Sequence, residues 1–88
     1  MLASIVSSAF KKDIKRLKKR GKDLSKLHNI LTFLVKKEPL PKQYKEHFLI
    51  GNWKDYQEAH IEPDWLIIYK IKDNILYLVR TGTHSDLF

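Results

Sequence analysis

The 88-residue sequence has no cysteine, only three glycines and three prolines, and no long apolar run. The lack of cysteine excludes a disulfide framework and a thiolate metal site, and it fits a reducing compartment. No apolar stretch approaches the roughly 20 residues that a membrane-spanning helix needs. The first ten residues also lack the basic region of a signal sequence. We therefore expect a cytoplasmic protein with no membrane partner.

The three glycines lie far apart, at positions 21, 51 and 82, so they form no phosphate-binding loop. Apolar residues nevertheless make up 43% of the chain, which is too many for a disordered tail. A chain of this length predicts one domain, residues 1–88, near the lower end of what a single core can stabilise.

The positive charge is concentrated in the first half. The net charge is +7, but residues 1–45 carry 13 Lys/Arg against 3 Asp/Glu, whereas residues 46–88 carry 4 against 7. Such a block attracts polyanions, including RNA, DNA, acidic membranes and acidic proteins, although a well-solvated helix face explains it equally well. The candidate RNA-binding residues of this block are Lys11, Lys12, Lys15, Arg16, Lys18, Lys19 and Arg20.

The first half predicts a strand followed by two amphipathic helices. Residues 2–6 are partly β-branched, and Ser7 or Ser8 can cap the helix that follows. Apolar residues then recur at helical spacing among the lysines and arginines. Asp23 can cap a second helix with the same pattern, and Pro39 excludes its continuation.

The second half changes to strand patterns. Residues 52–62 alternate loosely, and residues 65–72 and 75–82 are dense in strand formers. Asp73-Asn74 suits a two-residue hairpin turn because both residues tolerate positive φ. The predicted fold class is α+β, in which an N-terminal strand and a two-helix hairpin pack on a small antiparallel sheet in two layers.

The two-residue turn predicts a register in which Ile71 faces Leu76, Ile67 faces Arg80 and Trp65 faces Gly82. Further along, Asp64 comes opposite Thr83 and close to His84. Strict alternation would separate those two side chains, so the pairing must loosen there, which Pro63 and Gly82 allow. The polar residues expected at this end of the hairpin are His60, Asp64, Arg80 and His84, with His47 as a further candidate.

This set of side chains fits cleavage of RNA. A base removes the proton of a ribose 2′-hydroxyl, a cation stabilises the phosphorane, and an acid protonates the departing 5′-oxygen. The substrate supplies the nucleophile, so we expect no cofactor, and the histidines lack a recognised metal-ligand spacing. Trp65 and Phe88 are candidates for stacking on bases, although a tryptophan at a strand start more often lies in the core.

Each residue also has a structural explanation. Asp64 after Pro63 fits a turn, and Arg80 fits a surface salt bridge to Glu62 or Asp64. The convergence of several such residues at one end of a hairpin is what favours a functional site.

Residues 46–88 resemble the YafQ branch of the RelE superfamily, the toxins of bacterial type II toxin–antitoxin modules. The shared pattern is H-x-L-x-G-x-W, then A-H-x-x-P-D-W, then R-T-G-T-H-x-x-L-F. The resemblance implies an enzyme, an mRNA interferase that cuts messenger RNA, usually on the ribosome. It also implies a cognate antitoxin, which we expect to be acidic with a segment that folds on binding.

Carried over by position, the resemblance implies an active site of His47, His60, Asp64, Arg80 and His84, with Trp65 and Phe88 nearby. His60, Asp64 and His84 would share the acid–base work. Arg80 would steady the phosphorane, and His47 would position phosphate or assist proton transfer. Which group is acid and which is base stays open. The chain departs from the family pattern at Phe48, where proline is frequent, and at Gln57, where arginine is frequent.

Two other functions remain compatible with the sequence. One is a non-catalytic RNA-binding or ribosome-binding module in which the histidines are structural. The other is a toxin of the same fold that acts on DNA gyrase, as in the ParE branch, although that branch lacks this set of histidines.

Overall fold

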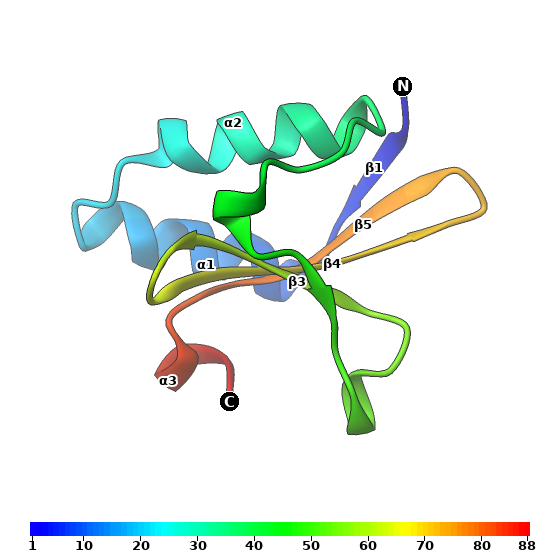
Figure 1. The fold of residues 1–88 in the computed structure, drawn as a ribbon. Coiled ribbons are helices and arrows are strands. Elements are labelled where there is room, and N and C mark those ends of the chain that lie inside the picture. The colour runs from blue at the N-terminus through cyan, green and yellow to red at the C-terminus, as the bar shows by residue number, and fades with distance from the viewer.

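The computed structural model describes all 88 residues and contains one five-stranded sheet with two long helices on one face (Figure 1). The elements are β1 (Ala3–Val6), α1 (Ser8–Lys19), α2 (Leu24–Val35), β2 (His47–Phe48), β3 (Gln57–Glu62), β4 (Trp65–Lys72), β5 (Ile75–Gly82) and α3 (His84–Leu87). Two single 3-10 turns, Lys42–Tyr44 and Gly51–Trp53, flank β2. None of the helices combines the length and the apolar character of a membrane span.

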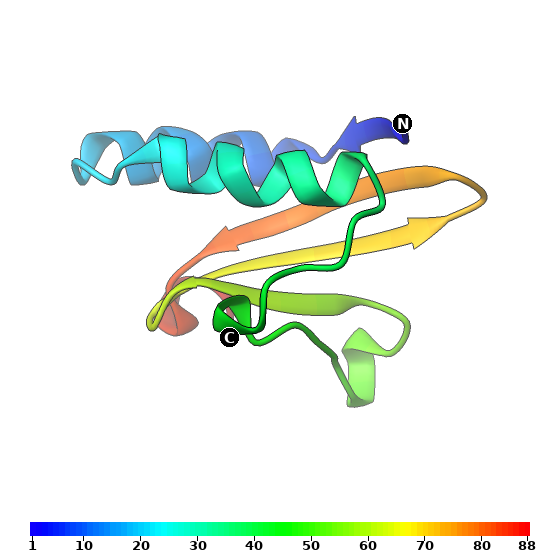
Figure 2. The ribbon, with the colours of Figure 1, turned by 45° about the horizontal axis from the view of Figure 1, so that its top comes forward.

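The two predicted helices begin at the predicted caps. The Ser7 hydroxyl accepts a hydrogen bond from the Phe10 N–H (2.9 Å), and the Asp23 carboxylate accepts one from the Ser25 N–H (3.0 Å). Both helices lie along one face of the sheet, as Figure 2 shows, and their apolar residues pack on it. The main core joins Phe10, Leu17, Leu27, Ile30 and Leu34 of the helices to Trp65, Ile67 and Tyr69 of β4. The predicted α+β class is confirmed.

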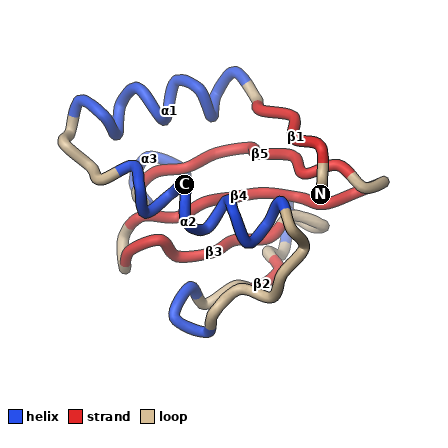
Figure 3. The backbone as a smooth tube through the Cα atoms, turned by 90° about the horizontal axis from the view of Figure 1, so that it is seen from above, coloured by secondary structure: helices blue, strands red, loops and turns tan.

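The sheet has the order β1-β5-β4-β3-β2, visible from above in Figure 3. β3, β4 and β5 form the predicted antiparallel meander, and β1 pairs in parallel with β5, from Ala3 opposite Ile75 to Val6 opposite Leu78. The two-residue strand β2 and the four-residue helix α3 were not predicted. Elements this short contain too few residues to show a period.

The β4–β5 hairpin follows the predicted register only near its turn. Asp73 and Asn74 both have positive φ (51° and 64°), and Ile71 lies opposite Leu76 as expected. A bulge between Leu78 and Arg80 then shifts the pairing by one residue, so that Ile68 faces Arg80 and Leu66 faces Gly82. The predicted Ile67–Arg80 and Trp65–Gly82 pairs are therefore wrong, because a bulge adds an unpaired residue on one strand.

The sheet face that α1 and α2 do not cover holds a smaller cluster. Leu66 and Ile68 of β4 alternate with the core residues and pack against Leu87 of α3. α3 therefore lies on the opposite side of the sheet from the long helices, as the red segment in Figure 1 shows. Glu58 and His60 are the cross-strand partners of Ile68 and Leu66, which places both on this second face.

Candidate active site

Three imidazole rings form a row on the second face of the sheet. The His60 ring lies in the middle, with its centroid 6.1 Å from that of His47 and 6.1 Å from that of His84. The rings come from β2, β3 and α3, so three segments that are separate in sequence build the row. Of the five residues predicted for the site, four gather here: these three histidines and Asp64, which contacts His84.

His84 is held by Asp64. The ring Nδ1 lies 2.8 Å from the Asp64 Oδ1, and the His84 backbone N–H donates to the same oxygen at 3.1 Å. The two hydrogen bonds from His84, the ring bond before the backbone bond, keep the pKa of the Asp64 carboxyl below its usual range. The predicted proximity of these residues is confirmed. It arises because α3 begins at His84, capped by Thr83, and not from strand pairing.

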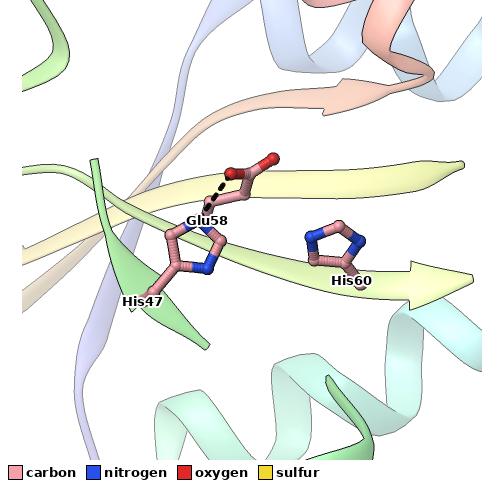
Figure 4. Close-up of side chains that lie close together, drawn as sticks. All are labelled: His47, Glu58 and His60. Atoms are coloured by element: carbon pink, nitrogen blue, oxygen red, sulfur yellow. Dashed lines mark ion pairs between the residues drawn. The ribbon is translucent and has the colours of Figure 1, made fainter. Parts of the chain in front are cut away.

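His47 also has a carboxylate partner, Glu58, which the sequence did not predict. Its Nε2 lies 3.0 Å from the Glu58 Oε2, and its Nδ1 lies 2.9 Å from the Lys45 carbonyl oxygen. Glu58 is only 6% exposed. Figure 4 shows this pair beside His60. Glu58 could have been found from the alternation of β3, which puts it on the same face as His60.

Glu46, the residue before His47, is held by a hydrogen bond from the main core. The Tyr69 hydroxyl, in the main core, donates a hydrogen bond to the carboxylate of Glu46. Burial, followed by this hydrogen bond, raises the pKa of Tyr69, which keeps the phenol a neutral donor. The residue that precedes His47 is therefore tied to the sheet.

Arg80 turns to α1. Its Nε and Nη2 donate to the two carboxylate oxygens of Asp13 (2.8 and 3.0 Å), and Asp13 also accepts from the Thr81 N–H (3.1 Å). The pKa of Arg80 is raised chiefly by its hydrogen bonding to Asp13. The Arg80 Nη1 has no hydrogen-bond partner within the protein. The alternative explanation of Arg80, a surface salt bridge to Glu62 or Asp64, is wrong: Glu62 pairs with Lys22 and Lys26, and Asp64 contacts His84.

Asp13 was missed because it lies within a basic segment, where a lone acid suggests a solvated surface. It is 1% exposed, three residues after Phe10 and four before Leu17, both of which face the core. That spacing was the available signal, since side chains three and four residues apart share a helix face.

The two aromatic residues predicted to stack on bases, Trp65 and Phe88, differ in their exposure. Trp65 is fully buried and its indole N–H donates to the Thr81 hydroxyl (3.0 Å). A base has no access to a buried ring, so the predicted stacking on Trp65 is wrong and its alternative place in the core is confirmed. Phe88 is 60% exposed and packs edge-on against Trp53, with ring centroids 6.2 Å apart. Phe88 therefore remains a candidate for stacking.

Two of the seven basic residues proposed for RNA binding have partners inside the protein. Arg20 donates two hydrogen bonds to Asp86 of α3 (2.7 and 3.0 Å), and Arg16 lies 3.3 Å from Asp13. The Arg20 bonds connect the C-terminal end of α1 to the helix that carries His84. The other five residues predicted to bind RNA are lysines of α1, and all five are exposed: Lys11, Lys12, Lys15, Lys18 and Lys19.

The histidine row also contains a possible metal-binding set. His47, Glu58 and His60 each offer one ligand atom, and these atoms all lie within 4.8 Å of one another. Imidazole and carboxylate groups are ligands of zinc and copper. The local spacing of the histidines gave no such signal because the ligands come from two different strands. A cleft of about 290 Å³ adjoins His60, between residues 43–45 and 60–63.

The departure at Gln57 lies away from the histidine row. Gln57 is the cross-strand partner of Tyr69, a core residue of the helix-covered face, and its amide oxygen lies 3.4 Å from the Tyr69 hydroxyl. Phe48, the other departure, belongs to β2 and pairs with Gln57.

Comparison with known proteins agrees with the resemblance noted in the sequence. The mRNA interferase toxin YafQ of Escherichia coli K12 is 49% identical over 83 residues, which cover 93% of this chain and 90% of the relative. The E. coli DinJ–YafQ complex contains a chain with a TM-score of 0.92 and 46% identity, covering 100% of this chain and 99% of that one. A metal-bound toxin from Helicobacter pylori gives a TM-score of 0.94 at 46% identity, with both chains fully covered.

A family model described as the bacterial toxin of type II toxin–antitoxin systems, YafQ, matches residues 3–88. The fold is thus that of a bacterial toxin of this class. The chain belongs to the YafQ family.

Proposed function

We propose that this chain is an endoribonuclease that cleaves messenger RNA as the toxin of a type II toxin–antitoxin module. Its similarity to the E. coli protein named mRNA interferase toxin YafQ supports the reaction. The Asp64–His84 contact is the observation that carries the proposal. A carboxylate that holds one imidazole nitrogen leaves the other oriented for proton transfer.

The proposed reaction is attack of a ribose 2′-hydroxyl on the adjacent phosphate, with the histidine row supplying proton transfer. Negative charge that develops on the phosphorane is stabilised by Arg80, whose Nη1 is not used by Asp13. The nucleophile belongs to the substrate, so the proposed enzyme requires no metal.

The basic helix supports a role for the ribosome. α1 packs on the opposite face of the sheet from the histidines, so its exposed lysines do not face an RNA strand held at the histidine row. A second RNA segment fits them, and ribosomal RNA is its proposed source. Binding through lysine–phosphate contacts would weaken steeply with salt. A messenger RNA substrate places the reaction in the cytoplasm.

An acidic antitoxin is the proposed protein partner. The E. coli relative was solved as a DinJ–YafQ complex, and the net charge of +7 on this chain favours an acidic partner. Copurification of this chain with the product of an adjoining reading frame tests the assignment.

The reaction is tested by expressing the wild type, His84→Ala and Asp64→Asn in bacteria and mapping the ends of cellular messages. We expect the wild type to cut messages, and each variant to lose about 10²-fold or more in cleavage. His28→Ala, an exposed histidine on α2, is the matched control and should cut like the wild type.

Three outcomes would contradict the proposal. Unimpaired cleavage by His84→Ala would show that His84 takes no part in the reaction and that the candidate site is not catalytic. Salt-sensitive RNA binding by the wild type without cut products would favour the non-catalytic binding module. Intact messages together with lost DNA supercoiling would favour action on gyrase.

A further inference from the structure

A line of aromatic rings with one lysine among them crosses the second face of the sheet. It begins at Phe88, directly after α3, whose ring centroid lies 6.2 Å from that of Trp53. The Trp53 ring lies 5.5 Å from that of Tyr56 in an edge-on contact. The Lys70 Nζ follows, 4.9 Å from the Tyr56 ring centroid and 5.2 Å from the Tyr77 ring centroid. These five residues, which we call the aromatic track, connect the end of α3 to β5.

The aromatic track shares a face of the sheet with the histidine row. Leu66 is the cross-strand partner of His60, and Lys70 follows Leu66 by four residues on the same face of β4. That spacing corresponds to about 13 Å along the strand. Tyr77 is the cross-strand partner of Lys70 and so belongs to this face as well. An RNA strand with a phosphate at the histidine row can therefore continue along the track without leaving this face.

A groove of about 230 Å³ lies at the β5 end of the aromatic track. Its lining includes Tyr56, Lys70 and Tyr77, together with the apolar side chains of Ile5 and Val79. The two tyrosine hydroxyls and the Lys70 ammonium have no hydrogen-bond partner within the protein, and the ammonium lies against the two rings instead. The groove thus offers one cation and two hydroxyl donors beside aromatic and apolar surface.

These groups match the chemistry of a nucleotide in single-stranded RNA. Aromatic side chains stack on bases of any sequence, and lysines between them contact the backbone phosphates. Tyrosine hydroxyls also donate hydrogen bonds to phosphate oxygens. The contacts with both rings hold the Lys70 ammonium in one place. An acidic protein segment would use the lysine alone, whereas a nucleotide uses the lysine, the rings and the hydroxyls together.

On the basis of the proposed function, we infer that the groove of Tyr56, Lys70 and Tyr77 binds one nucleotide of the messenger RNA beside the cut. Lys70 contacts the phosphate of this nucleotide, and Tyr77 stacks on its base. The groove contains no histidine or carboxylate, so it contributes to the affinity for the message and transfers no proton.

The test measures affinity for a single-stranded message with a 2′-deoxyribose at the mapped cut position, which keeps the RNA intact. We expect Tyr77→Val to raise the Kd at least about fivefold, the lower limit for the loss of one stacked base. Tyr77→Phe keeps the ring and should retain most of the affinity. Lys70→Gln should weaken binding and reduce the slope of log affinity against log salt by about one unit, as for one lost phosphate contact.

Two series of modified messages identify the nucleotide. In the first series one base at a time is removed, and in the second one phosphate at a time is replaced by an uncharged methylphosphonate. At one position beside the cut, removal of the base should weaken binding to the wild type but not to Tyr77→Val. An uncharged linkage at this nucleotide should weaken binding to the wild type but not to Lys70→Gln. Such coupling between a side chain and one group of the RNA indicates direct contact.

Lys36→Gln is the matched control for charge. Lys36 is an exposed lysine at the C-terminal end of α2, a helix that packs on the opposite face of the sheet. The control variant should bind the message with the affinity and the salt slope of the wild type. Because Lys70 forms no salt bridge, Lys70→Gln keeps the test valid if Tyr77→Val unfolds.

Three results would overturn the inference. The first is unchanged affinity in both Tyr77→Val and Lys70→Gln. The second is a loss of affinity without coupling at any position of either series, which would mean that neither side chain contacts the RNA. The third is weaker copurification of the antitoxin with unchanged affinity for RNA, which would assign the groove to the antitoxin. A wild type that shows the expected coupling but cuts no message would support the groove and contradict the proposed function.

Discussion

Arg80 and Asp13 are 67 residues apart in sequence and form a two-pronged ion pair between β5 and α1. Asp13 is 1% exposed, and the Arg80 side chain is 26% exposed. The ion pair fixes the position of the Arg80 guanidinium near the end of β5, and it binds α1 to the same strand.

Arg80→Ala should lower the free energy of unfolding by about 3 kcal/mol, because the buried Asp13 carboxylate loses its two-pronged partner and keeps only Arg16 as a charged partner. The double variant Arg80→Ala/Asp13→Asn should recover most of that stability but none of the cleavage. Urea denaturation and message cleavage, measured on the same preparations, separate the two roles. Recovery of cleavage in the double variant would show that Arg80 does not contact the phosphate.

Gly82→Ala should displace α3 and with it His84. An added Cβ at this position would lie 2.9 Å from the Asp86 Oδ2, and the φ of 155° suits glycine alone. We expect a loss of about 1–3 kcal/mol in the free energy of unfolding, together with reduced cleavage. Gly21→Ala is the control, since its φ of 78° brings backbone strain as well, but a Cβ there meets no atom within 4 Å. Equal activity in both variants would contradict the role of this contact.

Asp86→Asn should destabilise the protein at neutral pH and less so in acid. The Arg20 guanidinium, followed by the Thr83 N–H, holds the pKa of Asp86 below its ordinary value of 3.8. A carboxyl whose pKa is lower in the folded state stabilises the fold above its unfolded pKa, and this contribution disappears as the pH falls through the folded value.

The difference in unfolding free energy between wild type and Asp86→Asn should therefore be about 1 kcal/mol at neutral pH and shrink below about pH 4. Urea denaturation across this range measures it. The carboxyl groups of Asp23, Glu62 and Asp64, whose pKa values are also lowered, remain in both proteins and cancel in the difference. A difference that is independent of pH would contradict the ion pair.

Zinc should inhibit cleavage, because a metal ion on His47, Glu58 and His60 removes two imidazoles of the row from the reaction. A chelator should leave the wild-type rate unchanged. Calorimetry should show that Glu58→Gln binds zinc more weakly than Glu62→Gln does. A rate that rises on adding zinc would contradict the metal-independent mechanism.

The local parts of the fold were predictable from the sequence. The Asp73-Asn74 turn and the strand formers around it defined β4 and β5, and Ser7 and Asp23 defined the helix starts. The bulge before Arg80 was not predictable, because hairpin register is set by the turn only until an extra residue intervenes.

The carboxylates were also only partly predictable from the sequence. Asp64 was found because its neighbours in the chain lead into a strand, and the predicted hairpin register placed it near His84, although the contact itself arises from the start of α3 at His84. Asp13 and Glu58 acquire their partners only when α1 packs on β5 and when β2 pairs with β3. Helical spacing and strand alternation carried a signal for the burial of both residues, but neither pattern names the arginine or the histidine that each one holds.

In the proposed mechanism the protein itself supplies acid and base to a nucleophile carried by the RNA. The most direct measurement is cleavage, in the presence of a chelator, of a ribosome-bound message with a single 2′-deoxyribose at the mapped cut position. We expect this linkage to stay intact while the all-ribose message is cut at the wild-type rate. Cleavage of the deoxyribose linkage at an equal rate would contradict the proposed mechanism.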